Sequence, residues 1–534
     1  MGCPARAVGY SHGMTSIEAA GGSREWRRPV SGRLLAVLTA ALGLLPLPAA
    51  AQPPATPLRA GSSTPLRAGP STPLSAGGPS VTFLHFNDVY EITPVEAGKA
   101  GGLARLARFG AELKARTPGL IITLGGDYVS PSALGTARVN GERLAGRQMV
   151  AVLNVLGLDW ATFGNHEFDL PEAALRARLA ESTFRIVSSN VTDAAGALFP
   201  NTVRHAVIPL KTPGGRLRVG LIGLTVDVNK QPWVRYAPAV EAARAAVAEL
   251  KGHCDVVVAL THLTLAGDQE IAEQVPEIDL ILGGHDHENW VIERGPRFTP
   301  IVKADANART AAIITLRVPG KGARPMVSTR LQRIDDRMPE GPRTAAEVRK
   351  WVALGYQGFR ADGFEPALLV ATTTVVLDGR ESTVRTRATN LTELITGAML
   401  HEAGTTIALF NGGSIRIDDV LPPGPITQYD VIRVLPFGGK IVKAMVTGTL
   451  LSKVLQVGEQ NRGTGGFLHA AGVPATIDPA GRYSVVTSDF LLTGGEANLE
   501  FLTRGNPGLS DIADLRDIRM VLIDELKRRY GSKQ

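Results

Sequence analysis

The chain has 534 residues, of which 44% are hydrophobic and 20% are charged. A chain of this length usually forms two to four domains, and the composition suits a soluble globular protein. The formal net charge is +7, but seven arginines and two glutamates in residues 1–80 contribute +5 of it. The rest of the sequence has no basic stripe, so we expect no nucleic-acid polymer as a partner.

Residues 1–51 have the pattern of a secretory signal peptide. Arg27, Arg28 and Arg33 precede an apolar run, and the three alanines at 49–51 resemble a cleavage site. The run is too short to span a bilayer. We therefore expect an exported protein, periplasmic or secreted, with no stable membrane insertion after cleavage. The alternative is an uncleaved segment that serves as a short membrane anchor.

Residues 52–80 contain an eight-residue repeat that begins at Thr56, Thr64 and Thr72. Each copy starts Thr-Pro-Leu and is rich in Pro, Gly, Ser and Ala. Such a segment cannot bury a hydrophobic core, so we predict a disordered linker.

Residues 81–335 alternate short apolar runs with amphipathic segments, which predicts an α/β domain. The candidate helices are 102–116, 142–156, 170–181, 238–251 and 269–275. Polar residues follow five of the apolar runs, which lie at 81–86, 120–124, 160–163, 256–260 and 280–282. These polar residues are Asp88, Asp127, Asn165 with His166, His262, and His285 with His287.

The position of these residues indicates a metal site. Ligand sites of α/β sheets form beyond the carboxyl ends of the strands, so we expect the side chains to meet on one rim. Carboxylates, an amide and imidazoles are typical ligands of a two-metal hydrolase. A single Asp would be explained as a turn or helix cap, and a single His as a core or surface residue. The ordered series of seven polar residues is much harder to explain in that way.

Residues 336–365 predict a polar helix that connects two domains, with Ala345, Val348 and Trp351 along one face. Residues 366–527 predict a second, α+β domain. Its landmarks are Arg385-Thr-Arg-Ala-Thr-Asn, Asn411-Gly-Gly-Ser-Ile-Arg416, Leu-Pro-Phe437-Gly-Gly and Asp-Phe490-Leu-Leu-Thr-Gly-Gly-Glu496.

The sequence resembles the calcineurin-like metallophosphoesterases. More narrowly, it resembles the 5'-nucleotidase / UDP-sugar hydrolase / 2',3'-cyclic phosphodiesterase family. The narrower resemblance rests on Phe-Leu-His-Phe-Asn-Asp at 83–88, Gly-Asn-His-Glu-Phe-Asp at 164–169 and the C-terminal landmarks. It covers roughly residues 80–525. It implies an N-terminal β-sandwich flanked by helices, a helical connector and an α+β 5'-nucleotidase C-terminal domain that binds substrate.

The resemblance also implies two divalent metal ions, and the sequence leaves open whether they are Zn, Mn, Fe or Co. Site 1 would contain Asp88, Asp127 and His287. Site 2 would contain Asp127, Asn165, His262 and His285. His166 would stabilise or protonate the leaving group, and Asp169 would orient it. The alternative for Asp169 is a cap on a helix that begins near Leu170.

In the C-terminal half, the resemblance implies a nucleotide-binding site. Arg385 and Arg416 would bind phosphate and ribose groups, because a guanidinium donates paired hydrogen bonds to phosphate. Asn411 would contact the base, and Phe437 and Phe490 would stack on its two faces. Core packing is the alternative for either ring. Glu496 would be the acid that faces the ribose.

Two positions depart from the family pattern. The usual Asp-x-His is Asp88-Val89-Tyr90, so site 1 lacks one imidazole and we expect it to bind metal more weakly. We expect Tyr90 to point away, with water in the gap, and the alternative is a phenolate ligand to Fe(III). The usual Gly-Gly-Asp-Gly is Gly494-Gly495-Glu496-Ala497, which lengthens the acid by one methylene.

The leading hypothesis is an exported phosphoesterase that hydrolyses nucleoside 5'-monophosphates with a hydroxide that bridges two metals. Cyclic 2',3'-nucleotides and nucleotide sugars are further candidate substrates. One alternative is a phosphatase for a non-nucleotide phosphoester. Another, motivated by Tyr90, is a nucleotide-binding protein with a degenerate metal site.

Overall fold

The computed structural model describes residues 78–320 and 323–531. The predicted signal peptide of residues 1–51 lies outside these residues, as does the predicted linker up to residue 77. The last residue of that linker, Ser80, instead opens the first strand. None of the helices in the described ranges has the length and apolar character that a membrane crossing needs.

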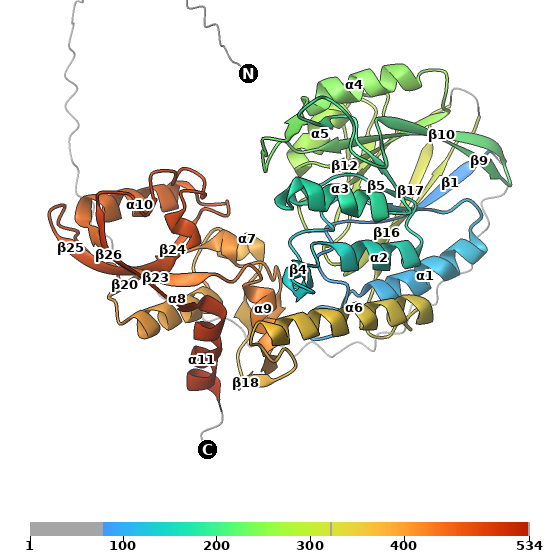
Figure 1. Cartoon of the computed structure of the whole chain (residues 1–534). Coiled ribbons are helices and arrows are strands. Elements are labelled where there is room, and N and C mark those ends of the chain that lie inside the picture. The colour runs from blue at the N-terminus through green and yellow to red at the C-terminus, as the bar shows by residue number, and fades with distance from the viewer. Residues whose placement is uncertain (1–77, 321–322, 532–534) are drawn as a thin grey trace, which may run out of the picture. The chain divides into compact units, whose positions relative to one another are not determined.

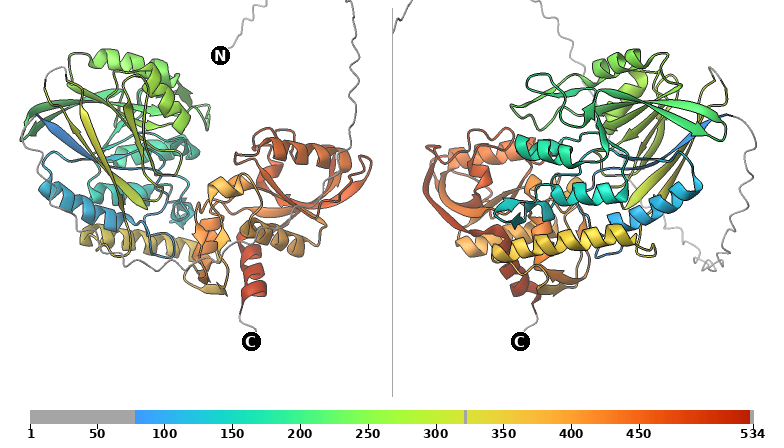
Figure 2. Two further views of the ribbon diagram at one scale, coloured as in Figure 1. Left: turned by 180° about the vertical axis from the view of Figure 1, so that it is seen from behind. Right: turned by 45° about the vertical axis from the view of Figure 1, so that its right-hand side comes forward.

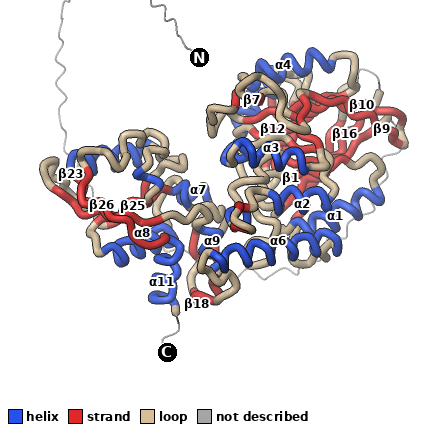
Figure 3. Tube along the Cα trace, viewed as in Figure 1, coloured by secondary structure: helices blue, strands red, loops and turns tan. Residues whose placement is uncertain are grey.

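The N-terminal half contains a seven-stranded sheet (Figures 1 and 3). Its order is β17 (Met326–Arg333), β16 (Thr310–Arg317), β1 (Ser80–Phe86), β2 (Ile121–Leu124), β5 (Trp160–Ala161), β6 (Arg185–Val187) and β8 (Thr202–Val203). Within this sheet, β1, β2, β5, β6 and β8 run parallel to one another. β16 pairs antiparallel with β1, and β17 pairs antiparallel with β16.

A six-stranded sheet forms the second layer of this half. Its order is β14 (Trp290–Arg294), β15 (Thr299–Lys303), β13 (Leu280–Gly283), β12 (Val256–His262), β10 (Gly215–Thr225) and β9 (His205–Thr212). The four central strands are parallel, and β14 and β9 pair antiparallel at the edges. Both sheets are therefore mixed, and together they form the β-sandwich that the family resemblance implies.

The two sheets pack face to face through one apolar cluster. The cluster includes Phe83 and Leu316 from the first sheet and Leu221, Val258 and Leu282 from the second, all completely buried. Burial of this apolar area from water is the main force that holds two sheets together. The packing also brings the carboxyl ends of β1, β2, β12 and β13 to a common rim.

His85 joins the two sheets at that rim. Its Nε2 donates to the Gly283 carbonyl of β13 (2.9 Å), and its Nδ1 accepts from the Thr123 hydroxyl of β2 (3.0 Å). Burial lowers the pKa of His85 to about 4, so the ring is neutral and can accept at one nitrogen while it donates from the other. His85 thus fixes the start of the loop that carries His285 and His287.

Helices cover the outer faces of the sandwich. In Figure 1, α4 (Ala239–Leu250) and α5 (Leu265–Gln274) lie on one side of the paired sheets. The other side carries α1 (Leu103–Arg116), α2 (Arg147–Leu156) and α6 (Pro342–Ala361), and Figure 2 shows the same layers from two further directions. The helix α3 (Glu172–Glu181) also packs against α2.

The predicted helix at 142–156 begins five residues late. Glu142–Arg143 instead forms strand β4, which pairs with β3 (Arg138–Val139), and α2 starts at Arg147. The reason is Gly146, whose left-handed backbone (φ 82°) ends the turn before the helix begins. The predicted polar helix within residues 336–365 is α6, which is shorter at both ends.

The C-terminal half is α+β. Its five-stranded sheet has the order β24 (Leu468–Ala471), β20 (Ile407–Asn411), β25 (Arg482–Ser488), β23 (Lys440–Thr447) and β26 (Leu509–Asp517). One face packs on α10 (Gly448–Gln460), and the other packs on α8 (Asn390–Ala403) and α11 (Ile518–Tyr530). Smaller elements are α7 (Glu381–Val384), α9 (Gln428–Val434) and the strand pair β18 (Leu369–Thr373) and β22 (Gly424–Thr427).

Candidate metal centre and substrate site

The six predicted metal ligands lie at strand ends on one rim of the sandwich. Asp88, Asp127 and Asn165 follow β1, β2 and β5, which are neighbours in the seven-stranded sheet. The three histidines come from the other sheet: His262 is the last residue of β12, whereas His285 and His287 follow β13. The rim is therefore shared by two sheets.

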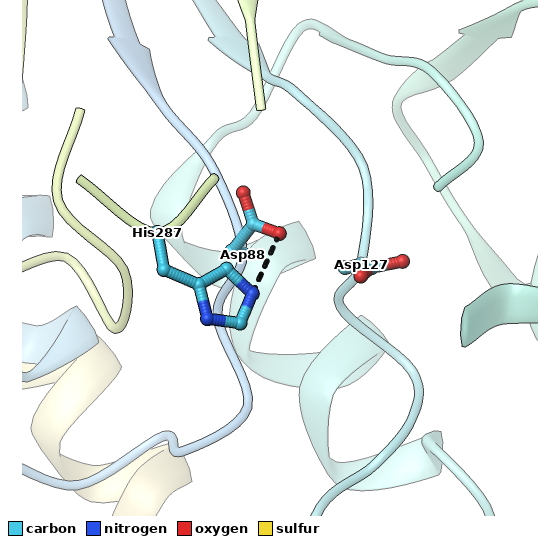
Figure 4. A group of neighbouring side chains, drawn as sticks. All are labelled: Asp88, Asp127 and His287. Atoms are coloured by element: carbon cyan, nitrogen blue, oxygen red, sulfur yellow. Dashed lines mark ion pairs between the residues drawn. The ribbon is translucent and has the colours of Figure 1, made fainter. Parts of the chain in front are cut away.

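The ligand atoms are close to one another. Asp88, Asp127 and His287 each offer one atom within 4.8 Å of the others, and Figure 4 shows the pair that Asp88 forms with His287 beside Asp127. The distance from Asp88 Oδ1 to His287 Nε2 is 3.3 Å. His262 Nε2 lies 3.2 Å from both Asp127 Oδ2 and Asn165 Oδ1. The His285 ring lies edge-on to His262, with ring centroids 5.1 Å apart.

The charges of this group fit a divalent cation. Asp88 and Asp127 are completely buried carboxylates. Burial lowers the pKa of His262, but Asp127 and Asp88 outweigh it and raise that pKa to about 9. The carboxylates thus hold positive charge at Nε2 of His262, while its Nδ1 donates to the Gly125 carbonyl (2.7 Å). A metal ion would take the place of that charge, and the Nδ1 contact already orients the ring for it.

The backbone at the ligands is strained. Asp88, Asp127, His285 and His287 all have positive φ, at 52°, 54°, 83° and 59°. Such a conformation costs about 1–3 kcal/mol for a residue other than glycine and persists only where its surroundings enforce it. The strain lets these loops turn their side chains inward directly after a strand.

Glu167 organises two of these loops. Its carboxylate accepts from the backbone N–H groups of Gly164 (2.5 Å), Asp127 (3.0 Å) and Tyr128 (2.7 Å). Burial and the charge of Asp127 raise the pKa of Glu167 to about 7. Gly164 is required here because a Cβ at this position would come within about 2 Å of Asp127 Oδ1. Glu167 thus belongs to the support of the site.

Lys303 supports the loop after β13. Its buried ammonium donates to the carbonyls of Leu263 (2.7 Å) and Gly284 (2.8 Å), and it pairs with Asp268 (2.8 Å) and Asp286. A buried charge needs such a complete set of partners. The sequence gives no sign of this role, since Lys303 ends an ordinary apolar strand.

Tyr90 points into the metal centre, so the expectation that it points away is wrong. Its hydroxyl lies 2.8 Å from His287 Nε2, 3.1 Å from Asp127 Oδ2 and 3.4 Å from Asp88 Oδ1. The ring is buried, and these are the polar groups that its hydroxyl reaches. Burial, with the charges of Asp127 and Asp88, raises the pKa of the phenol well above its usual value.

His166 and Asp169 form a pair beside the metal centre. His166 Nδ1 lies 2.7 Å from Asp169 Oδ2. Asp169 also accepts from Asn229 Nδ2 (2.8 Å) and the Ser130 hydroxyl (3.2 Å), which fix its orientation. The alternative role of Asp169 as a helix cap is wrong, because α3 begins at Glu172 without a side-chain cap.

The predicted arginines approach this pair from the C-terminal half. Arg416 Nη2 donates to His166 Nε2 across 3.0 Å, so Nδ1 carries the ring proton in this arrangement. Arg385 pairs with Glu381, which also lies 3.9 Å from Arg416 Nη1. Glu381 thus holds both guanidinium groups, and its role cannot be recognised from the sequence because no strand or glycine motif marks it.

The predicted base site contains two exposed rings and a polar pair. Phe437 is 50% exposed and Phe490 is 42% exposed, so neither ring belongs to the core. Asn411 Nδ2 donates to Glu496 Oε2 (2.7 Å), and Asn411 Oδ1 accepts from Ser414 (2.6 Å). The structure therefore brings Asn411 and Glu496 together.

Comparisons with known proteins agree with this architecture. The sequence matches the family model for calcineurin-like phosphoesterases over residues 81–289 and that for the 5'-nucleotidase C-terminal domain over residues 369–482. The chain is 28% identical over 461 residues to the trifunctional nucleotide phosphoesterase protein YfkN of Bacillus subtilis. This match covers 72% of the chain but 30% of that protein.

Two further relatives match over most of their length. Human 5'-nucleotidase is 26% identical over 74% of this chain and 75% of its own length. The crystal structure of a 5'-nucleotidase precursor from Thermus thermophilus is 25% identical, with a TM-score of 0.68 over 84% of this chain and 96% of that chain.

The N-terminal half thus belongs to the calcineurin-like phosphoesterases, and the chain is a metal-dependent phosphoester hydrolase. With its second matched domain, the chain belongs to the 5'-nucleotidase family of this class.

The position of Tyr90 leads to a prediction about metal binding. The phenol occupies the space between the site 1 ligands and stays protonated, so site 1 should bind metal more weakly than site 2. We expect Tyr90→His to tighten the weaker site, because an imidazole offers a lone pair at neutral pH. Titration of the metal-free protein with Mn²⁺ measures both sites, and Tyr530→His is a control far along α11. Two equally tight sites in the wild type, or a phenolate-to-iron absorption band, would contradict this account.

Proposed function

We propose that this protein is an exported enzyme, periplasmic or secreted, that hydrolyses nucleoside 5'-monophosphates. The observation that carries the proposal is the contact of Arg416 with His166, because it joins an arginine-containing substrate site to the metal centre. The arginine-flanked apolar leader supports export. Cyclic 2',3'-nucleotides and nucleotide sugars are further candidate substrates.

Two divalent metal ions, when bound, would activate water for attack and neutralise the charge of the phosphate oxygens. Asp88, Asp127 and His287 would hold one ion. Asp127, Asn165, His262 and His285 would hold the other, with Asp127 shared between them. Zn, Mn, Fe and Co all suit this mixture of oxygen and imidazole ligands.

The side chains around the centre have separate tasks in this proposal. Arg416 and Arg385 donate to the phosphate and ribose oxygens, and Glu381 holds them in place until substrate enters. Once Arg416 turns to the phosphate, Nε2 of His166 is free to carry a proton to the leaving oxygen. Asp169 keeps the His166 ring oriented through its contact with Nδ1.

The two exposed phenylalanines favour a nucleotide over a simpler phosphoester. Phe437 and Phe490 are both about half exposed, and burial against a flat base would remove them from water. Stacking tolerates different bases, so we propose broad base specificity. Asn411 and Glu496 would contact the polar edges of the nucleoside.

Phosphate release is the direct test of this function. We expect metal-dependent release from adenosine monophosphate with at least one of Mn, Zn, Co or Fe. We expect slower release from sugar phosphates, because they lack a base to stack. Preference for a sugar phosphate would favour the non-nucleotide phosphatase. Absence of release with every metal would favour the nucleotide-binding protein with a degenerate site.

We expect His166→Ala to lose most of its turnover and to keep its bound metal. The imidazole serves the leaving group rather than a metal in this proposal, and loss of such a group costs about 10²–10⁴-fold. Steady-state rates and metal analysis of the purified variant check this, with the exposed His253→Ala as the matched control. Turnover close to wild type would refute the role of His166.

We expect Phe437→Ala and Phe490→Ala each to weaken the use of adenosine monophosphate by roughly 1–3 kcal/mol in kcat/KM, the value of one lost stack. The small substrate p-nitrophenyl phosphate has no base, so its hydrolysis should stay close to that of the wild type. If both substrates are affected equally, the rings have a structural role and the base-binding proposal is wrong.

A further inference from the structure

One hydrogen bond links a predicted metal ligand to the other half of the chain. His287 Nδ1 lies 2.6 Å from Oδ2 of Asp418, a residue that is 131 positions away in the C-terminal half. Both side chains are largely buried, at 13% and 12% exposure. His287 Nε2, on the opposite edge of the ring, faces Asp88 in the metal centre. Asp418 therefore contacts the side of the imidazole that a metal would not use.

Asp418 is itself held in place from two further directions. Its Oδ1 accepts from the backbone N–H of Glu381 (2.8 Å), and its carbonyl accepts from Arg309 Nη2 (2.8 Å). Its backbone has a positive φ of 39°, a conformation that needs support from its surroundings. An isolated surface aspartate would not be fixed in this way, so the carboxylate is built into the site.

We propose that Asp418 is a positioning residue for the metal ligand His287 and that the C-terminal half thereby completes the metal centre. A metal needs the lone pair of Nε2, and that lone pair exists in a neutral imidazole only when Nδ1 carries the proton. The Asp418 carboxylate accepts from Nδ1 and fixes this tautomer. The inference rests on the metal centre of the proposed function, but not on its nucleotide substrate.

The substitution Asp418→Asn tests this assignment with little change in shape. Asparagine tolerates positive φ as aspartate does. The carboxylate serves two N–H donors, His287 Nδ1 and Glu381 N, with two acceptor oxygens. An amide has one acceptor, so its NH₂ group must face one of these donors. If it faces His287, the ring proton moves to Nε2 and blocks metal binding; if it faces Glu381, the loop loses its anchor.

Asp419→Asn is the matched control. Asp419 lies next in the chain and also reaches the N-terminal half, where its Oδ2 accepts from the backbone N–H of Glu96 (3.1 Å). Like Asp418 it is largely buried, but its side chain forms no hydrogen bond or ion pair with His287. A general loosening of the contact between the halves should therefore affect both variants, whereas loss of His287 positioning should affect Asp418→Asn alone.

The experiment is calorimetric titration of the metal-free full chain with Mn²⁺, without nucleotide. We expect Asp418→Asn to weaken one of two binding events by about 10–100-fold, as for other partners of metal-ligating histidines, and to leave the other event unchanged. Asp419→Asn should bind as the wild type does. In a His287→Gln background, Asp418→Asn should have no additional effect, because the ring that it orients is gone.

Three outcomes would overturn the inference. Wild-type metal binding by Asp418→Asn would show that His287 needs no such partner. Equal weakening by Asp419→Asn would show that the effect comes from contact between the halves in general. Absence of Mn²⁺ binding by the wild type would remove the metal centre, and the proposed function with it. Failure of nucleotide hydrolysis with intact, Asp418-dependent metal binding would refute only the proposed substrate.

Discussion

The buried carboxylates of Asp88 and Asp127, at the ends of adjacent strands, determine which groups must surround them in this site. The parallel pairing of β1 with β2 places Phe86 beside Leu124, so the loops with Asp88 and Asp127 leave the sheet at the same level. Two buried negative charges are costly unless nearby groups compensate them. The surrounding loops therefore supply N–H donors and imidazoles. The backbone N–H of His285 donates to Asp88 (2.9 Å), and that of His166 donates to Asp127 (2.8 Å). A divalent cation satisfies the same demand more fully.

The loops that follow the strands are strained because their side chains must turn inward to compensate the charges of Asp88 and Asp127. Glu167 and Lys303, which stabilise these loops, are buried for the same reason. Four of the predicted ligands adopt left-handed backbone conformations, so that their side chains turn inward at once after a strand. Glu167 and Lys303 stabilise the backbone of these loops. Glu167 accepts from backbone N–H groups, and Lys303 donates to backbone carbonyls. Both supports are buried polar groups, and burial is tolerated only because their hydrogen-bond and ion-pair partners are in place. Changes to either residue should therefore act on the metal centre through the backbone.

The sequence predicts the parts of the fold and site that depend on local order along the chain. Apolar runs mark the strands, and the residues directly after them mark the ligands, because strand direction alone decides which end faces the rim. Asn229, Glu381 and Asp418 could not be found in this way. They reach the site through contacts that the local sequence does not mark, for example Asn229 with Asp169, Glu381 with Arg416 and Asp418 with His287. The orientation of Tyr90 was also missed, since it depends on which polar groups surround a buried hydroxyl.

In the proposed reaction, the contacts between the two halves of the chain would respond differently to substrate and to metal. Arg416 donates to His166, Asp418 accepts from His287, and the Tyr429 hydroxyl donates to Glu91 (3.2 Å). A phosphate group would draw Arg416 away from His166, which breaks the first contact and frees Nε2 of His166 for the leaving oxygen. Asp418 accepts from Nδ1 of His287, and this contact would be strengthened if Nε2 of the same ring held a metal ion. By linkage, substrate entry would weaken one contact between the halves while metal binding would reinforce another. In the proposed reaction, substrate exchange would therefore leave intact the contact between Asp418 and His287.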